Sequence, residues 1–365
     1  MSVLETLSNA GIRTWLARTS SLDRYLRLRN AGTKFLDVEG TLVDIARLFE
    51  NVEYPGIAGV DAVVRDTDST VHIRCLDGPP SREDERVDAF TLRYDVQRER
   101  YVDPANVYRA IRSGEVAVTP SERAPAELIC DAALLAGRYR FAVAGAHQLK
   151  LADDARPLAA AEQHIFLSLL LTGRAPAAGL DLLRVSGFLE RYWNLLGPMD
   201  STDHSKEFHP EGNVWKHTME TFRYRKTRDL TVAFALLLHD CGKPYADSEG
   251  EHRFKNHADI GAEYARRFLI SMGFDSDLIH DVAWLIRYHM IPGALESLPR
   301  YRTREIMRSP LFPQLLELYR CDLSSTYRGP DGYYRACRIY RSFLKHEANP
   351  FRDAEGKKVV QRYVE

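Results

Sequence analysis

The spacing of hydrophobic and polar residues changes character along the chain. Within the first 120 residues, apolar and β-branched residues at 62–64 and 71–76 and the alternating segment at 86–95 predict half-buried strands. Residues 43–51 have the spacing of a short amphipathic helix. This mixture predicts a small mixed α/β domain over residues 1–120.

Beyond residue 120, apolar residues recur at helical spacing and strand signals largely disappear. The pattern predicts helices at 124–146, 160–172, 180–196, 214–225, 229–239, 257–273, 276–290, 302–308, 311–326 and 331–346. We therefore expect an α+β protein with a helical linker domain over 121–200, a mostly helical bundle over 201–348 and a polar tail over 349–365.

Composition narrows the class of protein. The 365 residues include 50 Lys+Arg and 51 Asp+Glu, and a formal charge of -1 excludes a protein that holds nucleic acid by bulk positive charge alone. The five widely spaced cysteines form no CxxC motif and are typical of reduced thiols in a cytoplasmic protein. No apolar run approaches 18 residues and the N-terminus lacks a signal-peptide layout, so we expect no membrane association.

The histidines are distributed unevenly, because eight of the 12 lie between His204 and His289. Several fall in short segments that combine imidazole or carboxylate groups with a helical context. These segments are FHPEGNVWKHT ending near His217, LLLHDCGKP with His239 and Asp240, NHADIGA with His257, IRYHM with His289, and LYRCDLSS with Asp322.

The adjacent His239 and Asp240 follow an apolar helix face, where a buried carboxylate is costly unless a partner neutralises it. A divalent cation is a strong candidate for that partner. Imidazole, carboxylate and water suit Mn, Mg, Ni, Co, Fe or Zn, and the lack of thiolate pairs argues against a structural zinc site. A lone histidine is more often a core or surface residue, and Asp322 alone would be a helix cap. The ordered set across several helices instead indicates one or two divalent metal ions.

These segments resemble the HD superfamily of metal-dependent phosphohydrolases. More narrowly, they are similar to the HD domain attached to bacterial tRNA nucleotidyltransferases and poly(A) polymerase-like proteins. The resemblance covers about residues 155–345 and identifies the helical bundle as an HD domain. It implies that a first metal site is formed by His217, His239, Asp240 and Asp322, and that His257 and His289 stand where a second site would be completed. It also suggests that Asp240 bridges two metals.

The same family has a nucleotidyltransferase domain upstream. Residues 43–49 with 55–59, and 86–95 with the following Tyr-Val-Asp-Pro, are similar to parts of that domain, although Ala89 interrupts one motif. A nucleotidyltransferase needs a Gly-Gly turn for the triphosphate and two carboxylates for Mg²⁺. No Gly-Gly turn precedes residue 45. We therefore expect a degenerate domain that serves as scaffold or contacts nucleotide or RNA.

Two carboxylate pairs are candidates for a remaining metal site in that domain. They are Asp37 with Glu39 and Asp66 with Asp68, each spaced one residue apart. The alternative for both pairs is that they bind no metal and are exposed carboxylates at a strand end or in a turn.

Substrate-binding candidates lie close to the metal ligands in sequence. Lys243 is three residues after Asp240, and Gly242 allows a turn that would bring its ammonium towards a phosphate. The alternative is a solvated lysine at a helix C-terminus. Arg253 and Arg320 offer guanidinium groups that match phosphate geometry. Arg320 lies two residues from Asp322, and Arg287 lies two residues from His289. Residues at this spacing on one helix point to different sides, which weakens both arginines as candidates. The catalytic candidates are Asp240, His239 and Lys243.

Arginine and tyrosine are interleaved at 300–304 and 333–341. Tyrosine rings can stack on bases and arginines can pair with phosphates, so this mixture is compatible with binding of a nucleotide or RNA. An ordinary solvated helix face whose tyrosines pack against the protein has the same pattern.

The sequence thus predicts a metal-dependent phosphohydrolase, in which metal-activated water attacks the phosphorus of a nucleotide or RNA 3′-end phosphoester. The family resemblance points to 2′,3′-cyclic phosphates or 2′(3′)-monophosphates as substrates. A nucleotide- or RNA-binding protein with a vestigial HD site is the alternative, and an active tRNA nucleotidyltransferase is the less favoured one.

Overall fold

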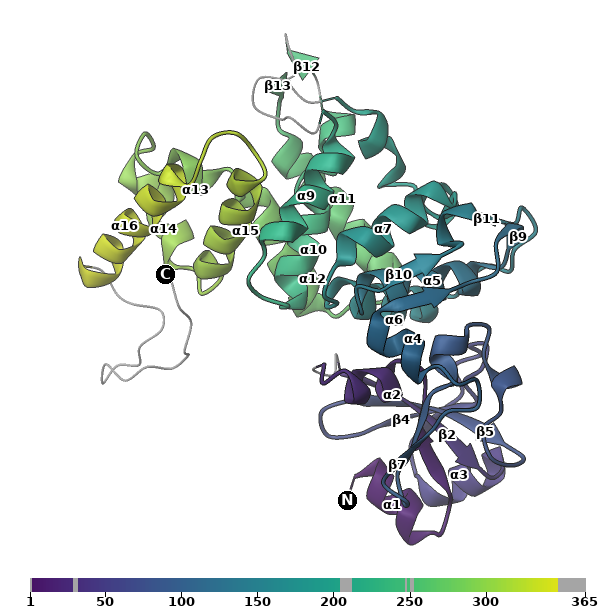
Figure 1. Cartoon of the computed structure of the whole chain (residues 1–365). Helices are drawn as coiled ribbons and strands as arrows, with labels where there is room; N and C mark the ends of the chain where they lie inside the picture. Colours follow the sequence, from purple (N-terminus) through teal and green to yellow (C-terminus); the bar gives the residue numbers. More distant parts are fainter. Residues whose placement is uncertain (1, 29–31, 204–211, 247, 250–252, 347–365) are drawn as a thin grey trace. The chain divides into compact units, whose positions relative to one another are not determined.

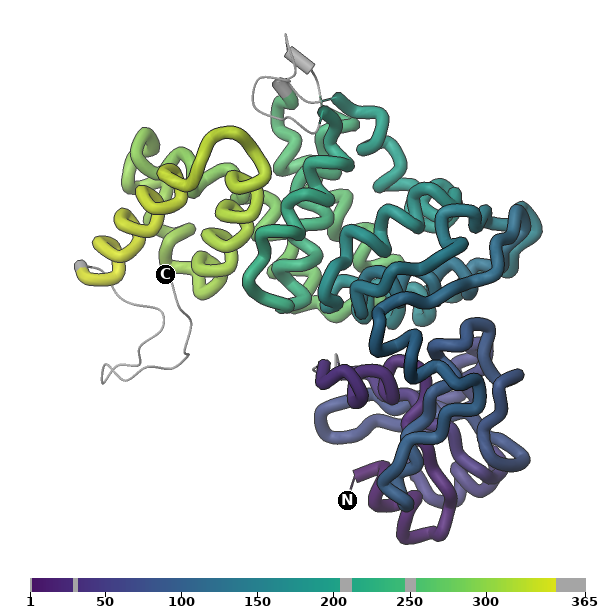
Figure 2. The backbone as a smooth tube through the Cα atoms, in the orientation of Figure 1, coloured from purple at the N-terminus to yellow at the C-terminus, as the bar shows by residue number. Residues whose placement is uncertain are grey.

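The computed structural model describes residues 2–28, 32–203, 212–246, 248–249 and 253–346. The chain divides into two compact units, one ending at Leu170 and the other beginning at Leu171, and each is treated separately (Figures 1 and 2). The first unit is mixed α/β and the second is helical, so the expected α+β class is confirmed. The finer division at residues 120 and 200 stays a prediction.

A seven-stranded sheet with the order β3-β4-β5-β2-β1-β6-β7 forms the first unit's framework. Its strands are β1 (Thr14–Leu16), β2 (Thr33–Glu39), β3 (Val52–Glu53), β4 (Ala62–Arg65), β5 (Thr70–Leu76), β6 (Arg93–Asp95) and β7 (Arg100–Val102). The predicted strands at 62–64 and 71–76 are confirmed. β2 and β5 run parallel with Leu36 opposite Ile73, and the other neighbouring strands are antiparallel.

Four helices accompany the sheet: α1 (Val3–Asn9), α2 (Arg18–Tyr25), α3 (Leu42–Leu48) and α4 (Tyr108–Ser113). The predicted helix at 43–51 is confirmed as α3, which begins at a capping box between Thr41 and Asp44. Its buried Ile45 joins Leu7, Leu36 and Ile73 in one hydrophobic cluster. Burial of these side chains against the sheet is what fixes the helices to it.

The expected strand at 86–95 is wrong over most of its length. Residues Asp88–Thr91 form a 3-10 helix, and only Arg93–Asp95 pair as a strand. Thr91 donates its hydroxyl hydrogen to the Asp88 carbonyl at 2.7 Å, and the Phe90 amide donates to the Val87 carbonyl at 3.0 Å. These local bonds replace the ladder that the alternating pattern indicated.

Strand structure also continues past residue 120, against expectation. The predicted helix at 124–146 ends early, as α5 (Ala126–Gly137), because Arg140 adopts a left-handed conformation with φ 62°. The following β10 (Ala142–Ala144) pairs in parallel with β8 (Glu115–Ala117). A second parallel pair joins β9 (Ser121–Ala124) and β11 (Leu149–Leu151).

The second unit is a bundle of short helices. It contains α7 (Pro176–Val185), α8 (Phe188–Tyr192), α9 (Val214–Tyr224), α10 (Leu230–Leu238), α11 (His257–Ser271), α12 (Ser276–Tyr288), α13 (Ile291–Ala294), α14 (Arg300–Arg308), α15 (Phe312–Ser324) and α16 (Asp331–His346), after α6 (Ala160–Leu171) at the division. The predicted single helix at 180–196 is wrong, since Gly187 with φ 81° separates α7 from α8. Two-residue strands β12 (Ser248–Glu249) and β13 (Arg253–Phe254) form a small antiparallel pair.

Helix α10 occupies the centre of this bundle. Its residues from Val232 to Leu238 are all buried, and it packs against α9, α12 and α15 (Figure 1). An all-apolar helix surrounded on every side is the arrangement that its sequence favours. The residues that follow it directly, His239 and Asp240, are therefore delivered to the interior of the bundle. None of the helices in the described part of the chain combines the length and the apolar character needed to cross a membrane.

Candidate metal centre

The six residues proposed as metal ligands come from five different helices. His217 lies in α9, and His239 and Asp240 lie at the C-terminal end of α10. His257 begins α11, His289 caps the C-terminus of α12, and Asp322 lies in α15. The structure brings all six into one cluster, because α9, α12 and α15 pack against α10 and α11 packs against α12. Helix ends dominate because a terminal residue can turn its side chain into the centre of a bundle without disturbing the packed face.

Asp240 lies at the middle of the cluster. Its Oδ2 lies 3.3 Å from His239 Nε2 and 3.7 Å from His217 Nε2, and its Oδ1 lies 3.7 Å from His257 Nε2 and 4.0 Å from His289 Nε2. The two carboxylate oxygens therefore face two different groups of imidazoles. These groups, His217–His239–Asp240 and Asp240–His257–His289, each have ligand atoms within 4.8 Å of one another.

Hydrogen bonds fix the tautomer of three histidines. His239 Nδ1 lies 3.0 Å from the Leu236 carbonyl, His257 Nδ1 2.9 Å from the Phe254 carbonyl and His289 Nδ1 2.7 Å from the Ile286 carbonyl. A carbonyl oxygen only accepts, so each Nδ1 carries the hydrogen and donates it. Each neutral ring therefore turns an Nε2 lone pair towards Asp240.

The Nε2 atoms that meet in the cluster present lone pairs to one another, with no hydrogen between them. His257 Nε2 and His289 Nε2 lie 3.2 Å apart, and both are acceptors in the tautomer that their Nδ1 bonds require. The buried His239 Nε2 has no hydrogen-bond partner within the described residues. Acceptors facing acceptors at buried positions are costly unless a cation lies between them. Imidazole nitrogens with a shared carboxylate are a donor set that fits one or two divalent ions.

The electrostatics of the cluster support neutral imidazoles and a charged carboxylate. Burial disfavours the charged form and lowers the pKa of His289 to about 4. Burial also lowers the pKa of His257. For Asp240 burial acts in the opposite direction, but electrostatic interactions with the neighbouring His239 ring and the Lys243 ammonium outweigh it and hold the pKa well below its usual range. These protonation states are the ones that bind metal.

Of the substrate-binding candidates, Lys243 lies at the ligand cluster, whereas Arg320 pairs with a carboxylate outside it. Lys243 Nζ donates to Asp240 Oδ2 at 2.7 Å, so its ammonium lies at the cluster. Arg320 is paired with Glu317 at 2.8 Å and makes no hydrogen bond or ion pair with the described ligand candidates. Arg287 pairs with Asp259 at 3.0 Å, and both side chains are exposed. The side chain of Arg253 lies outside the described part of the structure, as do residues 204–211 of the HPEG segment.

Two glycines allow the His-Asp segment to approach α11 closely. A Cβ on Gly242 would lie 2.1 Å from the His257 carbonyl oxygen and 2.5 Å from the Gly261 nitrogen. Only a residue without a side chain fits there, because both neighbours are backbone atoms. This contact fixes the distance between Asp240 and the first turn of α11, which carries His257.

Replacing Gly242 by alanine should therefore displace α11 and separate the two groups of ligands. We expect a loss of about 1–3 kcal/mol in unfolding free energy from overpacking, together with weaker metal binding. Urea denaturation and metal titration of the full chain measure the two effects. Gly197→Ala is the matched control, since its Cβ would meet no atom within 4 Å. Equal stability and metal affinity in the two variants would contradict the close-packing explanation.

Ser325 belongs to the site although its sequence gave little sign of it. Its hydroxyl donates to the Asp322 carbonyl at 2.6 Å and lies 3.2 Å from His217 Nδ1. The one hydroxyl hydrogen is used by the carbonyl, so Nδ1 donates to the serine oxygen. The His217 Nε2 that faces Asp322 Oδ1 at 3.0 Å is then a lone pair facing a carboxylate, which again calls for a cation.

Because Ser325 fixes the ring of a ligand, Ser325→Ala should weaken binding of a divalent ion by roughly 10-fold. Unfolding free energy should also fall by about 1–3 kcal/mol, because the buried Nδ1 hydrogen of His217 loses its acceptor. Competition of the full chain with a metal-binding dye measures the affinity, and the neighbouring Ser324→Ala is the control. The same affinity in both variants would show that Ser325 does not orient His217.

The carboxylate pairs of the first unit are engaged by cations. Asp37 is 1% exposed, accepts from Arg74 Nε and Nη2 at 2.9 Å each, and accepts from Arg93 Nε at 2.5 Å. Glu39 pairs with Arg13 at 2.9 Å. The expected alternative of an exposed strand-end carboxylate is thus wrong for Asp37, which is buried in an ion network. Asp66 pairs with Lys34 at 3.3 Å and accepts from the Thr67 amide, whereas Asp68 is exposed.

The interleaved arginine and tyrosine segments lie in α14 and α16. Tyr301 is 74% and Tyr334 57% exposed, so their rings face solvent. Tyr340 is fully buried with its ring centroid 4.5 Å from that of Phe312. The tyrosine pattern is therefore mixed, with some rings in the core and others on the surface.

Comparison with known proteins identifies part of the chain. Residues 210–318 match the HD domain family. The CC-adding tRNA nucleotidyltransferase of Thermus thermophilus is 34% identical over 168 residues, which is 43% of this chain and 37% of the relative. The A-adding tRNA nucleotidyltransferase of Deinococcus radiodurans is 30% identical over 128 residues, or 32% of this chain and 29% of the relative. The matches thus span well under half the length of these relatives.

Solved structures resemble the chain over more of its length. The CCA-adding enzyme of Bacillus stearothermophilus in complex with CTP superimposes with a TM-score of 0.55 and 15% identity, covering 93% of this chain and 80% of that one. The apo form of a tRNA-processing enzyme gives a TM-score of 0.52 and 13% identity, with 94% and 90% coverage. At these identities the likeness concerns the fold alone. The chain contains an HD domain, and its relatives are tRNA nucleotidyltransferases, as the sequence motifs indicated.

Proposed function

We propose that this chain is a metal-dependent phosphohydrolase that acts on nucleotide or RNA-end phosphoesters, with 2′,3′-cyclic phosphates and 2′(3′)-monophosphates as the expected substrates. The observation that carries the proposal is the convergence of four imidazole Nε2 atoms on Asp240, with three Nδ1 hydrogens committed to backbone carbonyls. The HD domain match over residues 210–318 supports it.

The proposed chemistry assigns a task to each ligand. A bound divalent ion makes coordinated water acidic and polarises a phosphoryl oxygen. His217, His239 and Asp322 would hold one ion with Asp240 Oδ2, and His257 and His289 would hold a second with Asp240 Oδ1. Lys243 keeps Asp240 charged and places an ammonium within reach of phosphate oxygens.

A pocket adjoins the cluster through Ser325, and its lining includes Glu220 but none of the six ligand candidates. It has a volume of about 360 Å³ and is lined by Lys216, Tyr224, Ser325 and Tyr327, among others. Ser325 connects this cavity to His217. The Tyr327 side chain is 71% exposed and offers a ring on which a base can stack, and Lys216 offers a charge for phosphate. The exposed Tyr301 and Tyr334, with the arginines around them, extend the same chemistry to RNA.

A metal-by-substrate screen tests the proposal. The full chain is stripped with a chelator, reloaded with Mn, Mg, Ni, Co, Fe or Zn, and assayed on 2′,3′-cyclic nucleotides, on 2′-, 3′- and 5′-monophosphates, on cyclic dinucleotides and on a generic phosphodiester. We expect hydrolysis of the 2′,3′-cyclic or 2′(3′)-phosphates with at least one metal. Hydrolysis only of the 5′-monophosphates or the cyclic dinucleotides would contradict the substrate assignment.

A tRNA nucleotidyltransferase is the second candidate, because the curated relatives are named for that activity. The pairing of Asp37 with Arg74 and Arg93 argues against it, since a carboxylate held by two guanidiniums is not available to Mg²⁺. Labelled CTP or ATP with a tRNA that lacks its 3′ end separates the two. Incorporation at the tRNA 3′ end would establish the transferase, and we expect none.

A nucleotide- or RNA-binding protein with a vestigial HD site is the remaining alternative. The complete set of converging ligands argues against it. Elemental analysis of the purified chain and RNA binding in the presence of a chelator distinguish it from the hydrolase. Absence of metal together with undiminished RNA binding would favour the binding protein.

A further inference from the structure

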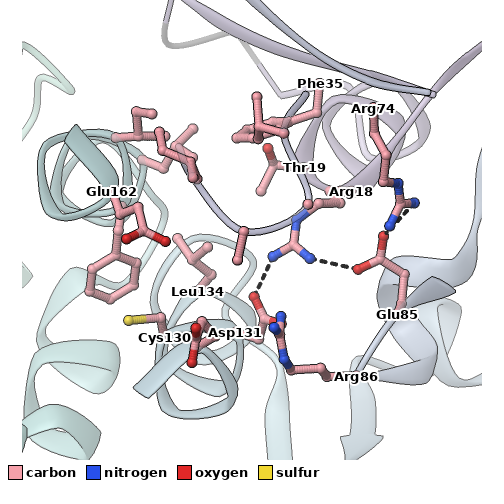
Figure 3. Close-up of a pocket in the computed structure, with 18 of the residues that line it drawn as sticks. Arg18, Thr19, Phe35, Arg74, Glu85, Arg86, Cys130, Asp131, Leu134 and Glu162 are labelled. Atoms are coloured by element: carbon pink, nitrogen blue, oxygen red, sulfur yellow. Dashed lines mark hydrogen bonds and ion pairs between the residues drawn. The ribbon is translucent and has the colours of Figure 1, made fainter. Parts of the chain in front are cut away.

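The first unit contains a separate cavity that the proposed hydrolase does not use. Its volume is about 360 Å³, within the range of roughly 300–1,000 Å³ typical of small-molecule sites. Its lining includes apolar side chains, among them Phe166 and the Phe35 and Leu134 labelled in Figure 3. The lining also includes charged residues, and their pairing decides which ligands the cavity can accept.

Three arginines and three carboxylates form a continuous network beside the cavity. Arg18 pairs with Glu85 at 2.6 Å and with Asp131 at 2.5 Å. Arg74 and Arg93 each pair with both Asp37 and Glu85, at 2.5 to 3.2 Å (Figure 3 shows the members that line the cavity). Every arginine in the network thus has two carboxylate partners, so its charge is neutralised before any ligand arrives.

More acidic than basic side chains line the cavity, although Arg156 outside the lining pairs with two of the acidic ones. Six acidic and three basic side chains line it: Glu83, Asp84, Glu85, Glu127, Asp131 and Glu162 against Arg18, Arg74 and Arg86. A nucleoside triphosphate would bring several more negative charges to this wall. Of the three lining arginines, only the exposed Arg86 makes no ion pair with a carboxylate in the described part of the chain, and one such arginine does not balance a triphosphate.

Two buried oxygen atoms on the wall still need a hydrogen-bond partner. Asp131 and Thr19 are each 2% exposed and both line the cavity. Asp131 Oδ1 accepts from Arg18, but Asp131 Oδ2 and Thr19 Oγ1 have no hydrogen-bond partner within the described residues. Leaving such a buried acceptor unpaired costs on the order of 1–3 kcal/mol, which a ligand with N–H donors would recover.

We propose that this cavity binds a small organic cation with an apolar body, whose N–H donors contact Asp131 Oδ2 and Thr19 Oγ1 while the body packs against Phe35, Leu134 and Phe166. Amidinium, guanidinium and protonated amine groups all supply this chemistry. The site disfavours nucleoside triphosphates, because Arg18 and Arg74 are already paired with carboxylates and Arg86 alone does not balance the charge. It is independent of the metal centre, since every residue that lines it belongs to the first unit.

Benzamidine and its neutral isostere benzamide test the proposal on the full chain by calorimetric titration at pH 7, with CTP as the polyanionic competitor. We expect benzamidine to bind at least 10-fold more tightly than benzamide, and CTP not to displace it. Asp131→Asn should weaken benzamidine binding at least 10-fold, whereas Asp68→Asn at an exposed position should not change it. Arg86→Gln should tighten it roughly 2- to 5-fold by removing a like charge.

Thr19→Val keeps the test decisive if Asp131→Asn does not fold. The change is isosteric and removes a buried hydroxyl oxygen that has no described partner, so it should not lower stability and should weaken benzamidine binding. Binding should also persist in Asp240→Asn, which separates this site from the hydrolase. No detectable benzamidine binding, equal affinity for benzamide, displacement by CTP, or unchanged binding in Thr19→Val would overturn the proposal.

Discussion

Asp240→Asn is expected to abolish phosphoester hydrolysis, with a decrease on the order of 10³-fold or more, equivalent to about 4 kcal/mol of transition-state stabilisation. Asparagine keeps the size of the side chain but removes the negative charge that lies among four imidazoles. Its amide nitrogen also replaces one of the two oxygens that face the ligand groups. The variant should therefore lose bound metal as well as activity, and elemental analysis alongside the hydrolysis assay measures both.

The control for this change is Asp259→Asn. Asp259 lies in the first turn of α11, and its side chain is 67% exposed and paired with Arg287 on the surface. It should retain metal and activity, because surface ion pairs contribute only about 0–1 kcal/mol. If Asp240→Asn kept both metal and hydrolysis, the assignment of Asp240 as the central ligand would be wrong.

Arg93→Met is expected to produce the largest loss of stability in the first unit. The Arg93 side chain is fully buried and pairs with Asp37 at 2.5 Å and with Glu85 at 2.6 Å. Methionine fills a similar space but leaves two buried carboxylates with fewer partners. Breaking a buried ion pair in this way costs about 3–5 kcal/mol.

Urea denaturation followed by far-ultraviolet circular dichroism measures this effect. The first unfolding transition of Arg93→Met should occur at a lower urea concentration than that of the unchanged chain. The control is Arg65→Met, whose side chain is 82% exposed and pairs with Glu53 on the surface, so its expected change is within about 1 kcal/mol. Equal transitions in the two variants would show that the buried network does not stabilise the sheet.

The pH dependence of the same network has a definite sign. Burial works against the charged form of Asp37, but Arg93 and Arg74 outweigh it and lower its pKa. A carboxyl group whose pKa is lower in the folded than in the unfolded chain stabilises the fold above its unfolded pKa. That contribution is lost as the pH falls through the lowered folded value.

Much of the candidate metal centre could be predicted from the sequence, because the proposed ligands lie at or near the ends of helices with strong apolar periodicity. The helix before His239 and Asp240 is recognisable from seven consecutive apolar residues, all of which are buried in the structure. Helices α11, α12 and α15 begin and end within a few residues of the expected positions. Ser325 was missed because a serine after a helix has an ordinary role as a cap. Its contact with His217 spans 108 residues.

The first unit was less predictable, because its strands are short and its important contacts also join residues that lie far apart in the sequence. Its short strands β8 to β11 have only three or four residues each, too few for an alternating pattern to appear. The ion network joins residues separated by up to 113 positions, and a sequence does not show which arginine will meet which carboxylate. Asp37 was a candidate metal ligand or an exposed strand-end carboxylate and Arg93 an ordinary strand residue, yet both are buried and pair with each other in the ion network.

The most direct test of the central claim is the hydrolysis of 2′,3′-cyclic AMP by the metal-free full chain as a divalent ion is added back in known amounts. We predict that activity is absent without metal, rises in proportion to the metal bound per chain, and reaches its maximum at one or two ions. A chain that takes up no metal, or that takes up metal and hydrolyses none of the phosphoesters, would contradict the assignment of this HD site as a phosphohydrolase.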